Sequence, residues 1–125
     1  MVTESAPTLL PEPAIEEIRL AAVLHALADP MRLRIALQLA DGHQDMACIA
    51  FDLPVSKSTT THHFRVLRES GVIRQHRRGT SRVSTLRAAD LEQVLPGVLD
   101  RVLAAARTEA RAEARGTSGD APTME

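Results

Sequence analysis

One segment near the middle of the chain, a polar helix followed by two short strands, constrains the fold most strongly. The helix has N-cap candidates at Ser56 and Ser58, whose hydroxyl oxygens can accept hydrogen bonds from the free N–H groups of a first turn. Phe64 and Leu67 are its main apolar residues, and most others are Lys, Ser, Thr, His or Arg. Gly71 is a typical left-handed residue beyond a helix C-terminus. The pattern predicts a helix, ending just before Gly71, that contacts a core along a narrow stripe and exposes its other side.

Two β-type segments follow this helix. Residues 72–76 and 82–86 are short and contain several β-branched residues, and a basic stretch with one glycine separates them. Such a pattern is typical of a β-hairpin. Arg77, Arg78 and Arg82 lie at or beside the predicted turn. We therefore expect a hairpin with an arginine-rich tip.

Apolar residues recur at helical spacing over four further segments: residues 14–28, 30–40, 45–52 and from 88 onward. Asp29 separates the first two, because a residue before proline avoids the helical region, and it can cap the second with Pro30 at the first helical position. Pro96 lies inside the last segment, so a kink or a break is expected there. The fold class predicted is mainly α with a small β-hairpin.

The chain has 125 residues, a length that suits one domain. We predict a disordered N-terminal tail over residues 1–13, a folded domain over 14–108, and a helix end with a disordered tail over 109–125, since prolines, glycines and small polar residues gather at both ends. No signal-peptide pattern and no apolar run of membrane-spanning length occurs in the sequence, so a cytoplasmic protein without a membrane partner is expected.

Charge is distributed unevenly along the chain. The net charge is only −1, yet residues 1–30 hold five acidic side chains against one arginine (net −4) and residues 54–87 hold eight basic side chains against one acidic (net +7). A local positive potential attracts a polyanion whatever the total charge is. With only two Phe and no Tyr or Trp, the chain lacks the aromatic platforms on which single-stranded nucleic acids stack. Double-stranded DNA is therefore the expected partner.

The major groove of B-DNA admits one helix, and the N-terminal half of such a helix meets the base edges. On the polar helix the candidate DNA-binding residues are Ser56, Lys57, Ser58, Thr60, Thr61, His62 and Arg65. In the hairpin, Arg77, Arg78 and Arg82 are suited to phosphates or to a narrow minor groove. Taken alone, each segment could instead be a solvated helix start or a solvated hairpin. Arg32 and Arg34 could contact the DNA backbone or pair with a nearby acid.

Two stretches resemble the ArsR/SmtB family of winged-helix repressors. Residues 26–35, ALADPMRLRI, are similar to that family's ALADPTRLRIL, and residues 56–73, SKSTTTHHFRVLRESGVI, are similar to SxSTVSHHLKVLREAGLV. The resemblance extends over about residues 15–103. It implies a winged helix-turn-helix fold of four helices, a β-hairpin wing and a fifth helix. It also implies a homodimer built from the first and last helices that represses transcription at a two-fold symmetric operator.

The resemblance does not extend to the family's metal sites. Many members carry a Cys-x-Cys pair in the third helix, where this chain has Asp45 and Ala47, with Cys48 displaced by one residue. Others use Asp and His ligands in the last helix, which here contains no His. We therefore expect no metal and no cofactor, and an effector that is a small molecule or a protein, if there is one. A non-standard site pairing His25 with Glu16 or Glu17 across a dimer remains an alternative.

An uncovered apolar stripe supports the dimer independently of the resemblance, because long exposed apolar patches mark interfaces. The candidate interface residues are Ile18, Leu91, Leu95, Val98, Leu99 and Val102. No activated nucleophile or phosphate-binding glycine loop suggests an enzyme. A winged-helix module that docks an acidic protein partner on its basic face is the second function considered.

Overall fold

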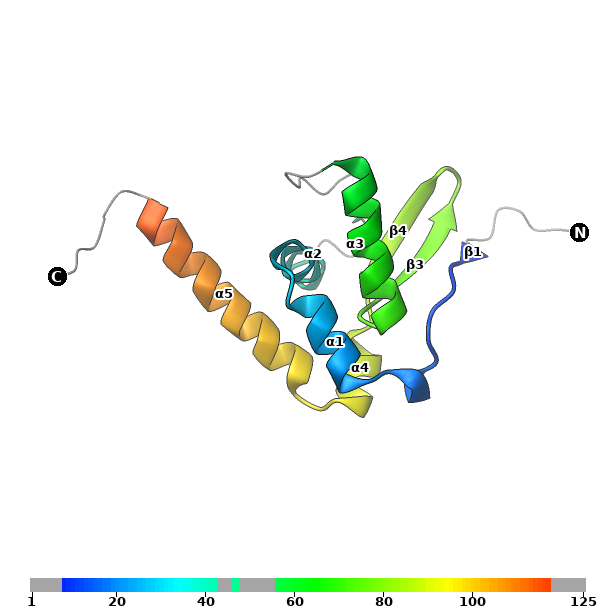
Figure 1. The fold of residues 1–125 in the computed structure, drawn as a ribbon, viewed down its shortest axis with the longest axis horizontal. Coiled ribbons are helices and arrows are strands. Elements are labelled where there is room, and N and C mark those ends of the chain that lie inside the picture. Colours follow the sequence, from blue (N-terminus) through cyan, green and yellow to red (C-terminus); the bar gives the residue numbers. More distant parts are fainter. Residues whose placement is uncertain (1–7, 43–45, 48–55, 118–125) are drawn as a thin grey trace, which may run out of the picture.

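A computed structural model describes residues 8–42, 46–47 and 56–117 (Figure 1). The helices are α1 (Leu20–Leu27), α2 (Pro30–Ala40), α3 (Lys57–Ser70), α4 (Ala88–Val94) and α5 (Val98–Thr117), preceded by a 3-10 turn at Ile15–Glu17. The strands are β1 (Thr8–Leu9), β2 (Met46–Ala47), β3 (Ile73–Arg78) and β4 (Ser81–Leu86). They form one sheet in the order β1-β3-β4-β2, in which all neighbouring strands are antiparallel. No helix in the described ranges is long and apolar enough to cross a membrane.

The predicted mainly helical fold with a β-hairpin is confirmed, and α2 begins where the sequence predicted. The Asp29 carboxylate caps it by accepting hydrogen bonds from the backbone N–H groups of Met31 (2.8 Å) and Arg32 (3.2 Å). Pro30 takes the first helical position, where its missing N–H leaves no hydrogen bond unmade. An N-cap of this kind stabilises a helix by about 1 kcal/mol.

The core is formed by side chains from all five helices and from the hairpin. Ile35 and Leu39 of α2 are completely buried. Phe64 and Leu67 of α3 and Leu91 of α4 expose at most 1% of their surface. Additional core positions come from α1, from β3 and β4, from Val72 just before β3, and from the first half of α5: Val23, Ala26, Leu27, Ile73, Leu86, Leu99 and Leu103. The continuous apolar cluster holds α3 against the rest of the domain along one side only.

The first predicted helix, over residues 14–28, is wrong in its first half. The chain instead makes a 3-10 turn, becomes extended at Ile18 and Arg19 (ψ 130° and 140°), and enters α1 at Leu20. The 3-10 turn has its own cap, because the Glu17 carboxylate accepts a hydrogen bond from the backbone N–H of Ala14 (2.8 Å). The extended step places the Ile18 side chain in the core, where it is 5% exposed, against Gly71.

The prediction of a disordered tail over residues 1–13 is wrong for its second half. β1 pairs with β3, so that Thr8 lies opposite Arg77, and the N–H of Leu10 donates to the Gln75 carbonyl (2.9 Å). Glu12 then forms a bidentate ion pair with Arg74 (2.9 and 3.0 Å). Residues 8–13 therefore form a strap that adds an edge strand to the hairpin.

The predicted helix over residues 45–52 is contradicted at two positions. Met46 and Ala47 form strand β2, which pairs with Ser84 and Val83 of β4. Backbone hydrogen bonding to an open sheet edge here replaces the helical bonds that the apolar spacing suggested. Asp45 and residues 48–55, including Cys48, lie outside the described residues.

The last predicted helix is broken at Pro96. α4 ends at Val94, and α5 begins at Val98 after Gly97 adopts a positive φ of 80°. The Glu92 carboxylate accepts the Gly97 N–H (3.0 Å) and so closes the junction. α5 then runs past α2, and its C-terminal half leaves the body of the domain (Figure 1).

Candidate nucleic-acid interface

The N-terminal half of α3 is a capped, polar helix start. The Ser56 hydroxyl oxygen accepts a hydrogen bond from the Thr59 N–H (3.2 Å), and the Thr60 hydroxyl donates to the Ser56 carbonyl (3.0 Å). At the other end Gly71 closes the helix in the left-handed conformation, as predicted. Lys57 is the first helical residue. The predicted cap and stop therefore fix the position of this helix in the sequence.

Burial divides α3 into two faces. Phe64 and Leu67 are buried, as the sequence predicted for its anchoring residues. Most of the predicted DNA-binding side chains are exposed: Ser56, Ser58, Thr61, His62 and Arg65; Thr60 is half-buried. Arg65 also forms an exposed ion pair with Glu69 one turn later (3.2 Å). The structure thus places a row of small hydroxyls and one imidazole on the side of α3 that faces away from the core.

The hairpin tip carries closely spaced arginines. Strand pairing extends farther than predicted, with Arg77 opposite Arg82 and Arg78 opposite Ser81, so the turn contains only Gly79 and Thr80. Arg77 and Arg78 are exposed and Arg82 is half-buried. Within the described ranges none of these three guanidinium groups pairs with a carboxylate.

Two like charges directly opposite each other across a strand pair destabilise it. Arg77 and Arg82 are such a pair. Strand alternation places them on the same sheet face as Gln75, which is fully buried and accepts a hydrogen bond from Arg68 of α3 (2.7 Å). The opposed arginines therefore lie on the face of the sheet that carries α3, beyond the buried part of that face.

The tip of the hairpin and the N-terminal end of α3 lie at the same end of the domain (Figure 1). The fold thus places the start of the predicted DNA-binding helix and the arginine-rich tip of the hairpin at one end of the domain. This end carries exposed hydroxyl and imidazole groups on the helix, and arginines in the hairpin that pair with no carboxylate of the described residues. Such a combination is suited to a duplex, in which base edges and phosphates alternate over a short distance.

The net charge of the basic segment overstates how many arginines are available. Arg74 and Arg87 are held by Glu12 and Asp90, and the hydrogen bond from Arg74 to Glu12 raises the pKa of that guanidinium. Arg87 also donates to the carbonyl of Pro13 (2.9 Å). These arginines therefore fix the N-terminal strap and α4 to the hairpin and are occupied in structural contacts.

Sequence reasoning missed a buried cluster behind α3. The Arg32 guanidinium, 8% exposed, donates to the carbonyl of Ala26 (2.8 Å) and lies 3.1 Å from Nδ1 of His63, which is 7% exposed. Asp29 lies on the other side of the same imidazole. The sequence indicated either a DNA contact or an ion pair with an acid for Arg32, and its guanidinium instead bridges α1 and α3. Asp29 and Pro30 at the start of α2 were the sequence feature that pointed to a junction of helices here.

Three of the predicted dimer residues are buried within a single chain. Ile18, Leu91 and Leu99 are 5%, 1% and 6% exposed, which corrects the view that the whole stripe is uncovered. The turn at Pro96 folds the two halves of the stripe back onto one core. The other three, Leu95, Val98 and Val102, are half-buried. Leu20 and Leu24, two exposed leucines on α1, were not among the predicted interface residues.

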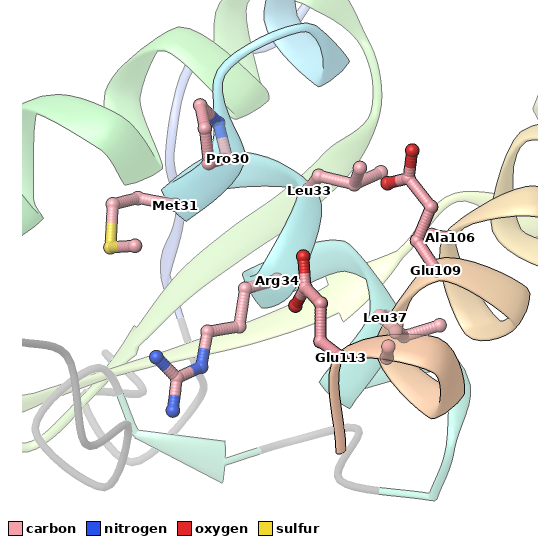
Figure 2. Close-up of a pocket in the computed structure, with 9 residues that line it drawn as sticks. Pro30, Met31, Leu33, Arg34, Leu37, Ala106, Glu109 and Glu113 are labelled. Atoms are coloured by element: carbon pink, nitrogen blue, oxygen red, sulfur yellow. The ribbon is translucent and has the colours of Figure 1, made fainter. Parts of the chain in front are cut away.

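A groove separates α2 from the C-terminal half of α5 (Figure 2). Its volume is about 340 Å³. The lining residues are Pro30, Met31, Leu33, Arg34 and Leu37 from α2 and Ala106, Glu109, Ala110 and Glu113 from α5. The lining thus combines apolar side chains with the charged side chains of Arg34, Glu109 and Glu113. The described residues include no group of three His, Cys, Asp or Glu side chains that could hold a metal ion.

Comparison with known proteins agrees with this architecture. Residues 29–75, which include α2, β2, α3 and the first part of β3, match the family described as "Bacterial regulatory protein, arsR family". An ArsR-like transcriptional regulator from Rhodococcus sp. RHA1 has a similar structure, with a TM-score of 0.51 and 25% identity over 82% of this chain and 93% of that one.

Curated relatives of this chain are transcriptional regulators. The HTH-type transcriptional regulator NmtR of Mycobacterium tuberculosis is 35% identical over 77 residues, and the transcriptional repressor SdpR of Bacillus subtilis is 35% identical over 57 residues. The matches cover 62% and 46% of this chain, and they span 64% of NmtR and 63% of SdpR. Residues 29–75 of this chain therefore match the arsR family of bacterial regulatory proteins, and transcriptional regulators are similar to it over a longer stretch.

Proposed function

We propose that the chain is a cytoplasmic, homodimeric transcriptional repressor that binds a two-fold symmetric double-stranded DNA operator. α3 enters the major groove with Thr60, Thr61 and His62 toward the base edges. Arg77 and Arg78 contact phosphates or the adjacent minor groove. The chain responds to a small molecule or a protein, since it lacks the thiolate pair and the C-terminal histidines of metal-sensing members.

The opposed pair Arg77 and Arg82 is the observation that carries this proposal. The two arginines lie directly opposite each other in the strand pair, and neither forms an ion pair with a carboxylate of the described residues. A phosphate between or beside them would relieve their repulsion, and planar guanidinium groups bind phosphate oxygens in pairs. The match to the arsR family over residues 29–75 and the repressor named among the relatives support this assignment.

Replacing Arg77 and Arg78 together with alanine should weaken binding to all duplexes to a similar extent. Each lost phosphate contact lowers the number of counterions released, so the slope of log K against log salt should flatten by about one to two units. Fluorescence anisotropy with a labelled duplex over a salt series measures the slope.

The matched control is R101A/R111A, which removes two exposed arginines of α5. It should leave the slope as in the original chain. A slope that R77A/R78A does not change would remove the hairpin from the DNA interface. If no duplex is bound even at low ionic strength, the DNA-binding proposal itself fails, and the acidic-protein module becomes the better explanation.

Replacing Thr61 or His62 with alanine should cost about 1–3 kcal/mol of binding free energy on a selected operator and much less on random DNA, because base-edge contacts carry sequence information. Both side chains are exposed, so folding should not change. Thr108→Ala on the exposed face of α5 is the control. Equal losses on selected and random duplexes would contradict a base-reading role.

A further inference from the structure

Three helices meet at a buried polar cluster on the core side of α3. Arg32 of α2 donates through Nε to the carbonyl of Ala26 in the last turn of α1 (2.8 Å), and its Nη1 lies 3.1 Å from Nδ1 of His63 in α3. The carboxylate of Asp29, which caps α2, lies 4.0 Å from Nε2 of the same imidazole. Both Arg32 and His63 are more than nine-tenths buried.

The chemistry of these groups fixes the protonation state of His63. A guanidinium has only donors, so Nδ1 must accept the hydrogen bond and therefore carries no proton. The ring hydrogen of the neutral imidazole then sits on Nε2, the atom that faces Asp29. A second proton, on Nδ1, would turn this acceptor into a donor that faces the Arg32 guanidinium, and it would bring two positive charges together.

The surroundings of His63 favour the neutral form. Burial lowers the pKa of the imidazole below its ordinary value of 6.5, and the charges of Arg32 and His62 lower it further, while Asp29 acts in the opposite direction. The contribution of neutral His63 to the free energy of unfolding is therefore fully present above about pH 6.5. It decreases as the pH falls toward the lowered pKa of the folded state. Protonation of His63 at low pH therefore weakens the contact between Arg32 of α2 and His63 of α3.

The position of His63 links this contact to the proposed DNA surface. It directly follows the exposed His62, and it precedes Phe64, which anchors the same turn from the core side. A shift of His63 away from Arg32 would therefore turn or move the half of α3 that carries Thr60, Thr61 and His62. Binding geometry at base edges tolerates little displacement of a helix.

We propose that Arg32 and neutral His63 position the DNA-facing half of α3, and that loss of their hydrogen bond in acid lowers affinity for a duplex. His63 is a positioning residue, since it acts through the placement of α3 and does not itself face the DNA. The inference rests on the proposed DNA-binding function. It predicts that affinity for a duplex decreases as the pH falls.

The test compares three full-length variants: H62Q, H62Q/H63N and H62Q/H63L. The H62Q background removes the neighbouring surface imidazole, and His25, His43 and His76 are present in all three variants. In H62Q/H63N the amide oxygen keeps an acceptor near the position of Nδ1 but cannot be protonated. In H62Q/H63L no acceptor remains for the buried guanidinium. The probe is a duplex that the original chain selects from a random pool at about pH 8.

Affinity of H62Q for this duplex should fall as the pH decreases below 6.5, by at most about tenfold at pH 5.5, because the proton that breaks the hydrogen bond must be lost again on binding. The H62Q/H63N variant should bind within about threefold of H62Q at pH 7.5 and lose this acid dependence, while H62Q/H63L should bind weakly at every pH. A rescue by asparagine but not by leucine distinguishes positioning from bulk packing.

Superimposable pH curves for H62Q and H62Q/H63N would overturn the inference while leaving DNA binding intact. No binding by any variant, or by the original chain, at any pH would instead contradict the proposed function. Circular dichroism at each pH verifies that the variants are folded. Independently of DNA, nitrogen chemical shifts of the His63 ring should show the proton on Nε2, and a proton on Nδ1 would also overturn the inference.

Discussion

Replacing Gly71 with alanine is expected to lower the free energy of unfolding by about 2–4 kcal/mol. Two effects add at this residue. Its φ of 93° lies in the left-handed region, which costs a residue with a side chain about 1–2 kcal/mol. A Cβ atom would also lie 2.7 Å from Cγ1 of Ile18, a buried branched side chain with little freedom to move. The junction between α3 and β3 would have to shift, and with it the extended segment before α1.

Gly79 provides the matched control for this prediction. It also has a positive φ, 64°, but no atom lies within 4 Å of the position that its Cβ would take. Gly79→Ala should therefore cost only the backbone contribution of about 1–2 kcal/mol. Urea unfolding at one fixed protomer concentration measures both variants, since association changes apparent stability. Equal losses at Gly71 and Gly79 would show that the contact with Ile18 contributes nothing.

Replacing Leu20 and Leu24 with glutamate is expected to convert the proposed dimer into a monomer. These leucines lie one helical turn apart on α1 and are 46% and 44% exposed, and they are the exposed large apolar residues of the described helices. Burial of two such side chains against a second copy is favourable, and two carboxylates on this face oppose it. Sedimentation equilibrium should then report the mass of one chain.

The variant L20E/L24E should also lose most of its operator affinity. When two half-sites are bound by linked subunits, the second contact is effectively intramolecular, and its loss lowers affinity by about 10²- to 10⁴-fold. Binding to a single half-site should change far less. This pair of substitutions is preferable to changes at Leu99, because a charge at that buried position would unfold the chain.

Leu9→Glu serves as the control for association. Leu9 is 53% exposed on β1, away from α1, so one added carboxylate there should leave the sedimentation mass unchanged. A dimer that persists in L20E/L24E would exclude this face of α1 from the interface. A chain that sediments as a monomer before any substitution would contradict the homodimer itself.

The local signals of the sequence were sufficient for the secondary structure of the central region. Asp29 and Pro30 begin α2, Ser56 caps α3 and Gly71 ends it, because each of these residues acts through hydrogen bonds or backbone angles within a few positions of itself. The break at Pro96 follows from the same kind of local rule. The polar face of α3 and the arginine-rich hairpin were predictable for the same reason.

Contacts between distant segments decided the rest. Residues 8–13 were predicted to be part of a disordered, proline-rich tail. Glu12 nevertheless forms an ion pair with Arg74, and β1 pairs with the open edge of β3, in both cases more than sixty positions away. Met46 and Ala47 likewise join β4 although their apolar spacing suggested a helix. An unpaired sheet edge supplies backbone hydrogen bonds that no pattern within the segment itself can reveal.

The sequence by itself determined which residues begin and end the helices, which side of α3 is polar and where positive charge concentrates, because these are properties of neighbouring residues. Only the tertiary structure decided which arginines remain available, since Glu12 and Asp90 occupy Arg74 and Arg87 while Arg77 and Arg82 face each other unpaired in the described chain. It alone buried Ile18, Leu91 and Leu99 and set His63 against Arg32. Burial and charge pairing depend on which segments meet, and that is settled by the packing of the whole core.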